Sequence, residues 1–101
     1  MATKRDTATQ IFARDQESAR VAARRFTRVL RADGDDANAW HALGVALIRL
    51  GDRAAACAAF RNAVQLDDTR VHSQLALGNL LFDSGRYEHA LRCFELAQGV
   101  R

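Results

Sequence analysis

The sequence predicts an all-α protein built from short helical hairpins, and three observations carry this prediction. Nearly half of the 101 residues are apolar, which is enough to form a hydrophobic core. There is no proline, and the helix formers alanine and leucine outnumber the β-branched residues. The chain also repeats itself, because a shift of 34 positions brings back the same kinds of residue in the same order.

The repeat is clearest between residues 40 and 63 and their copy further along the chain. Apolar residues recur within each copy at helical spacing, and a glycine separates two such runs. Each copy therefore predicts two helices joined by a tight turn. The pairs that lie 34 residues apart are Leu43 and Leu77, Gly44 and Gly78, Leu47 and Leu81, Gly51 and Gly85, Ala56 and Ala90, Phe60 and Phe94, and Ala63 and Ala97.

These positions resemble the tetratricopeptide repeat, whose pattern is W-x2-L-G-x2-Y, then A-x3-F, then P. The first copy has Trp40-x2-Leu43-Gly44-x2-Leu47 and Ala56-x3-Phe60, and the second has Gln74-x2-Leu77-Gly78-x2-Leu81 and Ala90-x3-Phe94. Leucine replaces the tyrosine in both copies, Gln74 replaces the tryptophan, and Asp68 replaces the proline. The resemblance implies antiparallel helix-turn-helix repeats stacked into a right-handed α-solenoid.

The resemblance also implies the organisation of the chain. Residues 1–101 form one domain with a degenerate first repeat at 3–34 and two further repeats at 37–70 and 71–101. Residues 18–32 fit the second helix of the first repeat, because Ala22-x3-Phe26 matches Ala56-x3-Phe60.

The N-terminal residues leave two arrangements open. A separate helix over residues 3–15 would complete the first hairpin, but Thr9 and Gln10 stand where leucine and glycine are expected. Since no glycine or proline interrupts the stretch, one long helix from about residue 5 to residue 32 is the alternative.

The ends of the later helices follow from turn and capping residues. Gly51 and Gly85 tolerate a left-handed backbone and end the first helix of each hairpin. Gly34, Asp35 and Asp36 break the chain and cap the helix that follows. Asp52 and Thr69 likewise stand just before predicted helices, where a side-chain oxygen accepts a backbone N–H bond. The helices are expected at about residues 37–50, 53–66, 70–84 and 87–99.

In tetratricopeptide proteins the first helices of the repeats line a concave groove, so the resemblance implies a protein-binding surface. Spacing supports it, because the implied residues fall on the helix faces opposite the repeat leucines. Several are apolar, which suits a peptide or helical segment, or else contact with the N-terminal helix or a second copy. The residues are Asn38, His41, Val45, Ile48 and Arg49, followed by His72, Leu75, Asn79, Phe82 and Asp83.

The kind of partner is narrowed by what the groove contains. Co-chaperones of this family hold an acidic C-terminal tail with lysine, asparagine and arginine side chains, but Lys4 is the single lysine of this chain. The apolar groove resembles instead the tetratricopeptide proteins that hold hydrophobic segments, such as type III secretion chaperones. The resemblance therefore implies an adaptor, a chaperone or an assembly scaffold.

The last predicted helix offers an alternative function. Tetratricopeptide arrays usually carry a further, solvating helix, and none follows here. We expect Leu91, Phe94 and Leu96 to leave some apolar surface exposed, so that the protein self-associates, binds a partner, or continues in a longer natural chain. Self-association is thus the competing prediction.

Charge and motifs argue against other classes of function. Residues 1–34 carry eight basic and four acidic side chains, and Arg20, Arg24, Arg28 and Arg31 lie on one helix face. No aromatic residue is interleaved with them, so we interpret them as a solvated face and expect no nucleic acid partner.

No catalytic, cofactor or metal motif is present, and neither a signal peptide nor a membrane span is indicated. The sequence predicts a cytoplasmic protein that is not an enzyme.

Overall fold

The computed structural model describes the backbone of residues 4–99 and the side chains of residue 10 and residues 14–99. Within residues 4–99 the chain forms five α-helices and no strand, which confirms the predicted all-α class. Residues 3, 100 and 101 belong to the predicted repeats but lie outside the described residues. The helices are α1 (Lys4–Ala32), α2 (Ala37–Arg49), α3 (Arg53–Leu66), α4 (Val71–Asp83) and α5 (Tyr87–Ala97).

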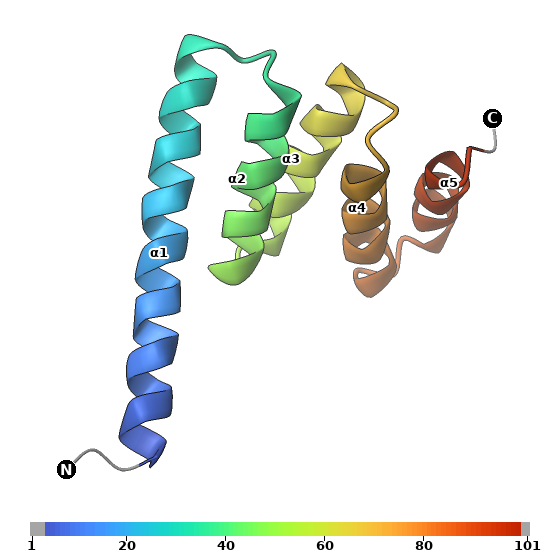
Figure 1. Ribbon diagram of the computed structural model, residues 1–101. Coiled ribbons are helices and arrows are strands. Elements are labelled where there is room, and N and C mark those ends of the chain that lie inside the picture. The colour runs from blue at the N-terminus through green and yellow to red at the C-terminus, as the bar shows by residue number, and fades with distance from the viewer. Residues whose placement is uncertain (1–3, 100–101) are drawn as a thin grey trace.

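The helices stand side by side in the order of the sequence. Two antiparallel hairpins, α2–α3 and α4–α5, follow one another, and α1 lies along α2 (Figure 1). The buried core centres on α3, α4 and α5, and α2 adds partly buried side chains to it. Its members are Ala56, Phe60, Leu77, Leu80, Leu81 and Ala90, with Leu47, Cys57, Ala76, Cys93 and Phe94 packed against them.

An aromatic ring packed on a helical glycine holds each hairpin together. A Cβ atom built on Gly44 would lie 2.7 Å from the Phe60 ring, and one on Gly78 would lie 2.7 Å from the Phe94 ring. Real side chains do not come so close, so only glycine leaves room for these rings. Phe60 is fully buried as a result.

The two hairpins also share one turn geometry. Gly51 and Gly85 have φ angles of 82° and 84°, as predicted for a left-handed backbone. After each glycine, a backbone N–H closes the helix end. Asp52 donates to the Leu47 carbonyl at 2.9 Å, and Arg86 donates to the Leu81 carbonyl at 2.8 Å. These bonds are 34 residues apart, so the repeat extends to the backbone.

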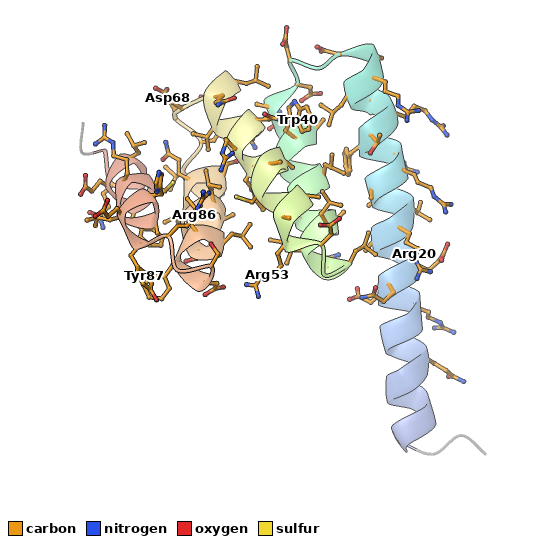
Figure 2. All side chains as sticks on the ribbon, turned by 180° about the vertical axis from the view of Figure 1, so that it is seen from behind. Arg20, Trp40, Arg53, Asp68, Arg86 and Tyr87 are labelled. Atoms are coloured by element: carbon orange, nitrogen blue, oxygen red, sulfur yellow. The ribbon has the colours of Figure 1, made fainter. Side chains whose placement is uncertain are left out.

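The replacement of tryptophan by Gln74 preserves a hydrogen bond that the sequence analysis did not anticipate. The Trp40 indole N–H donates to the Gly34 carbonyl at 2.8 Å, at the α1–α2 connection (Figure 2). The Gln74 amide donates to the Asp68 carbonyl, which is the equivalent acceptor one repeat later. Either donor fixes the connection onto the helix that follows it. Gln74 is fully buried, and its side-chain oxygen has no partner in the structure.

Capping follows the prediction in the central repeat and departs from it in the last one. Asp36 accepts from the Ala39 N–H at 3.0 Å and Asp52 accepts from the Ala55 N–H at 3.1 Å. The prediction that Thr69 caps α4 is wrong. Its N–H and hydroxyl both donate to Asp67, and these bonds lower the pKa of the Asp67 carboxyl.

One continuous helix occupies the N-terminal third, so the structure has the second of the two predicted arrangements. The helix is joined to α2 at Gln16, whose side-chain amide donates to the Arg49 carbonyl at 2.8 Å. The N-terminal part of α1 projects beyond α2 (Figure 1). The physical reason lies at Gln10 and Glu17, which replace both the ring-accommodating glycine and the turn glycine of the later repeats.

The ring-on-glycine contact predicts a strong effect of Gly44→Leu. The added side chain has to displace the buried Phe60 ring, and overpacking of this kind costs about 3 kcal/mol. We expect the free energy of unfolding, measured by urea denaturation, to fall by that amount.

Gly34→Leu is the matched control. Gly34 is exposed, and an added Cβ there would meet only the Leu30 carbonyl at 3.6 Å, an ordinary contact. The free energy of unfolding of this variant should stay within about 0.5 kcal/mol of the wild-type value. Equal denaturation midpoints for the two variants would contradict the role assigned to Gly44.

Candidate functional site

The predicted groove residues of α2 lie on an exposed face that continues to α4. Val45 is 37% exposed and Ile48 is 42% exposed, although both are apolar. Asn38 and Arg49 are exposed, and His41 is half-buried.

A polar network joins the N-terminal ends of α2 and α4. The His41 Nδ1 atom lies 2.7 Å from the Ser73 hydroxyl, which is fully buried. The Arg70 Nε–H donates to the same hydroxyl at 3.4 Å, and its Nη1 donates to the Asn38 side-chain oxygen Oδ1. The Ser73 hydroxyl can accept from Arg70 and at the same time donate to an unprotonated His41 Nδ1, an arrangement that suits a neutral imidazole.

The surroundings of His41 keep that ring neutral. Burial lowers the pKa of His41 from its ordinary value of 6.5, and the positive charge of Arg70 and the neighbouring His72 lower it further. The ring also packs edge-on against Phe60, with 5.2 Å between the ring centres. His41 is therefore a structural link between the repeats as well as a surface group.

Three of the predicted groove residues line a pocket with α1. His41, Val45 and Arg49 face Ala19 and other α1 side chains around a hollow of about 350 Å³. No α4 side chain lines this pocket. The structure therefore assigns this part of α2 to the junction with α1, which the sequence analysis had considered as an alternative.

The α4 members of the predicted groove form a second exposed strip. Leu75 is 39% exposed and Phe82 is 54% exposed, and His72 and Asn79 are exposed on the same helix. Phe82 packs edge-on against Tyr87 of α5, with 5.1 Å between the ring centres. This aromatic pair is the largest apolar feature at the C-terminal end of α4.

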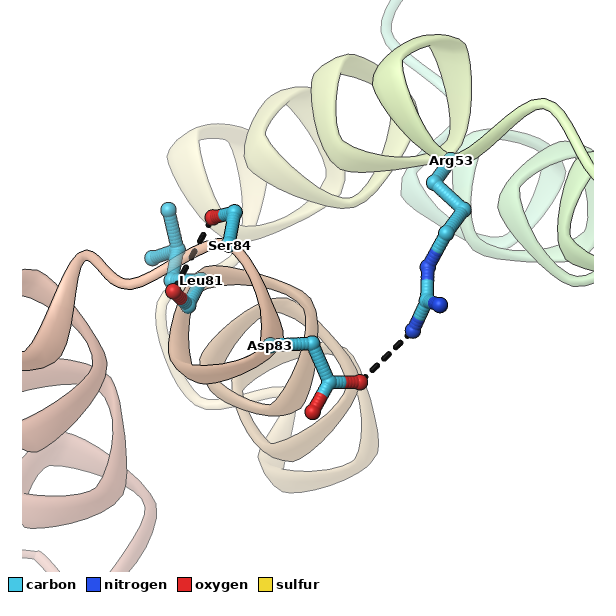
Figure 3. A network of polar contacts seen from close by, with 4 residues as sticks. All are labelled: Arg53, Leu81, Asp83 and Ser84. Carbon is cyan, nitrogen blue, oxygen red and sulfur yellow. Dashed lines mark hydrogen bonds and ion pairs between the residues drawn. The ribbon is translucent and has the colours of Figure 1, made fainter.

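Asp83 was expected beside the other groove residues, but it is directed towards α3. Its carboxylate accepts from the Arg53 guanidinium at 2.6 Å (Figure 3). The ion pair borders a pocket of about 540 Å³ between α3 and α4, which also includes Arg61 and Arg86. Arg53 and Arg61 lie on one face of α3, but Arg86 comes from the next repeat, so the pocket depends on tertiary packing and was not predicted from the sequence.

Two half-buried cysteines lie in the same region, and neither forms a disulfide. Both pack against the hydrophobic core, and Cys57 also lines the α3–α4 pocket. Burial, followed by the neighbouring Cys57, raises the pKa of the Cys93 thiol. A protonated thiol is a poor nucleophile, so Cys93 acts as a core residue.

The predicted interface residues of α5 differ in exposure. Leu91 is 58% exposed, whereas Phe94 and Leu96 are half-buried. The Phe94 ring packs against Gly78, so much of its surface belongs to the core. Leu91 is the most accessible of the three.

The arginine stripe of α1 lies on its exposed side. Arg24, Arg28 and Arg31 are exposed, and Arg20 is exposed with an ion pair to Glu17 at 3.5 Å (Figure 2).

Among the described side chains, no group of three or more histidine, cysteine, aspartate and glutamate residues could hold a metal ion. Within the described part of the chain, no helix has the length and apolar character required to cross a membrane.

The lowered pKa of His41 predicts a pH-dependent contribution to stability. The unfolded chain binds a proton at His41 more readily than the folded chain does. The free energy of unfolding therefore decreases as the pH falls below 6.5, and this loss is absent above 6.5. Between pH 7.5 and pH 5.5, the free energy of unfolding measured by urea denaturation should decrease less for His41→Gln than for wild type.

His89→Gln provides the control, because His89 is exposed on α5. We expect this variant to keep the wild-type dependence on pH. The assignment to His41 is wrong if both histidine variants flatten the dependence equally.

Comparison with known families agrees with this architecture. A family model described as "Tetratricopeptide repeat" matches residues 37–70, and a second model with the same description matches residues 71–101. A search of curated proteins finds no match to the chain. The matched residues cover α2 to α5 and include both ring-on-glycine contacts. The chain belongs to the tetratricopeptide repeat family.

Proposed function

We propose that this protein is an adaptor or chaperone that holds a peptide or helical segment of another protein on the face of α2 and α4. Tetratricopeptide repeats generally mediate protein–protein interaction, so the family supports the class of function. The observation that carries the proposal is the row of apolar side chains exposed along the two helices, Val45, Ile48, Leu75 and Phe82.

The two helices are suited to act as one surface. The bonds from His41 to Ser73 and from Arg70 to Asn38 join their N-terminal ends. Exposed apolar residues on neighbouring helices provide pockets for the apolar side chains of a partner, and Asn79 and His72 provide polar contacts beside them.

The second candidate function is self-assembly through α5. The exposed Leu91 supports it, because an exposed leucine beside half-buried apolar residues is typical of an interface. The two functions require different surfaces, so two sets of substitutions separate them.

The groove proposal predicts that Ile48→Asp combined with Phe82→Asp abolishes partner binding. Both side chains are about half exposed, so the helical content should remain close to wild type. Affinity capture from the lysate of the source cells, followed by identification of the bound proteins, compares this variant with wild type. Circular dichroism confirms the fold of each sample.

Leu91→Asp is the matched variant on α5. It should retain the captured partner if the groove proposal is correct, and light scattering should give a monomer for all three proteins. A dimer that Leu91→Asp dissociates, with no partner lost from the groove variant, would favour self-assembly. Collapse of the fold in the groove variant would place Phe82 or Ile48 in the core and contradict the surface assignment.

A further inference from the structure

A second apolar surface lies between α1 and α2, and Phe82 is not part of its lining. The pocket of about 350 Å³ described above has a floor of small and apolar side chains, namely Ala19, Ala22, Phe26, Ala42, Val45 and Ala46. A neighbouring hollow of about 550 Å³ along α1 shares Ala22 and Phe26 and adds Val21. The two hollows lie on either side of Phe26, and we call them together the α1 groove.

The repeat frame shows what the α1 groove lacks. Phe26 is the equivalent of Phe60 and Phe94, each of which packs on a glycine of the preceding helix. Within residues 4–99 no helix covers Phe26 in that way, and its ring is half-buried, whereas Phe60 is fully buried. The site has the shape of a repeat from which one helix is missing.

The chain's own residues are unsuited to fill this place. Gln10 is the equivalent of the two glycines, so its side chain would occupy the space that the aromatic ring needs. Glu17 is the equivalent of Gly51, whose φ of 82° is unfavourable for a residue with a side chain. The described helices of this chain therefore leave Phe26 partly uncovered, and this place suits a helix from another molecule.

The charges at the edges of the groove indicate the chemistry of that helix. Arg14 and Arg25 border the α1 side and Arg49 borders the α2 side. None of these three arginines forms an ion pair among the described side chains. The single acidic residue of the lining, Glu17, is paired with Arg20. The rim is therefore complementary to acidic side chains.

We infer that the α1 groove binds an acidic amphipathic helix of another protein. A small residue of that helix packs on Phe26, its apolar face covers Ala22 and Val45, and its acidic side chains meet the rim arginines. The inference rests on the proposed interaction function but uses the α1 side of α2, which shares Val45 with the apolar row and does not include Ile48, Leu75 or Phe82. It completes the first repeat with a helix supplied by the partner.

The same charges disfavour the N-terminal segment of a second copy as the occupant. In the sequence, residues 4–15 contain Lys4, Arg5 and Arg14 against Asp6 and Asp15, so this segment is basic overall. Insertion of the segment from a second copy would bring positive charge onto an arginine rim, and it would again present Gln10 to Phe26.

Three synthetic peptides test the inference directly. All have the sequence of residues 37–50, which contains a glycine suited to an aromatic ring. The acidic peptide has glutamate in place of Asn38, His41 and Arg49, and the basic peptide has lysine at the same positions. The third is the acidic peptide with Gly44→Gln, which copies the residue found at position 10.

Fluorescence anisotropy at low ionic strength, with the full chain, should show binding of the acidic peptide. Binding of the basic peptide and of the Gly44→Gln peptide should be weaker by about tenfold or more, which corresponds to 1.4 kcal/mol. The preference for the acidic peptide should decrease when salt is added, because the rim charges are exposed. Equal binding of the acidic and basic peptides, or no binding, would overturn the inference.

Protein variants locate the peptide and separate this site from the first one. Arg25→Glu combined with Arg14→Glu should reverse the preference between the acidic and basic peptides, and these exposed residues are not part of the core. Ile48→Asp combined with Phe82→Asp should bind the acidic peptide as wild type does, so failure of the proposed groove leaves this result intact. A dimer in light scattering that Phe26→Asp dissociates would show that a second copy occupies the groove.

Discussion

The structure depends on the packing of an aromatic ring against a helical glycine. In each complete hairpin the ring comes from the second helix and the glycine from the first, and in both a Cβ atom added to the glycine would lie only 2.7 Å from the ring. The contact fixes both the distance and the register between the helices, because the ring fits only where a Cβ atom is absent. Burial of one such phenylalanine contributes roughly 1.5–3 kcal/mol, a large share of the stability of a chain this small.

The consequences at the N-terminus follow from the loss of the same contact. Phe26 is present but its glycine is not, and the turn glycine is absent as well. Without a turn glycine the helix is not interrupted, and without the helical glycine a hairpin would gain no ring-on-glycine contact. The chain therefore remains one helix of 29 residues. Uncovered side chains on α1 and α2 then form the groove between these helices. A local change of two residues thus converts a hairpin into an open surface.

Part of this was predictable because it depends on residue type and spacing alone. The hairpins, the two turn glycines and the aspartate caps follow from the 34-residue frame. Other features depend on tertiary neighbours. Gln74 was taken as a departure from the motif, although its amide replaces the indole N–H of Trp40. His41 was assigned to the groove, and its bond to Ser73 requires a helix 32 residues away. Tertiary packing also decides that His41, Val45 and Arg49 line a pocket with α1, while Leu75 and Phe82 form a separate exposed strip on α4.

The caps of the last repeat connect stability with the binding surface. Arg70 and Arg86 stand where Asp36 and Asp52 cap the central helices, and neither arginine makes a side-chain cap. Loss of such a cap costs about 1 kcal/mol, and a positive charge at a helix N-terminus is itself unfavourable. Arg70 offsets part of this cost by bonding Asn38 and Ser73, so it joins α4 to α2. Arg70 therefore weakens the start of α4 but also aligns α4 with α2, the two helices that carry the exposed apolar face. The alignment of that face thus depends on a contact between two repeats.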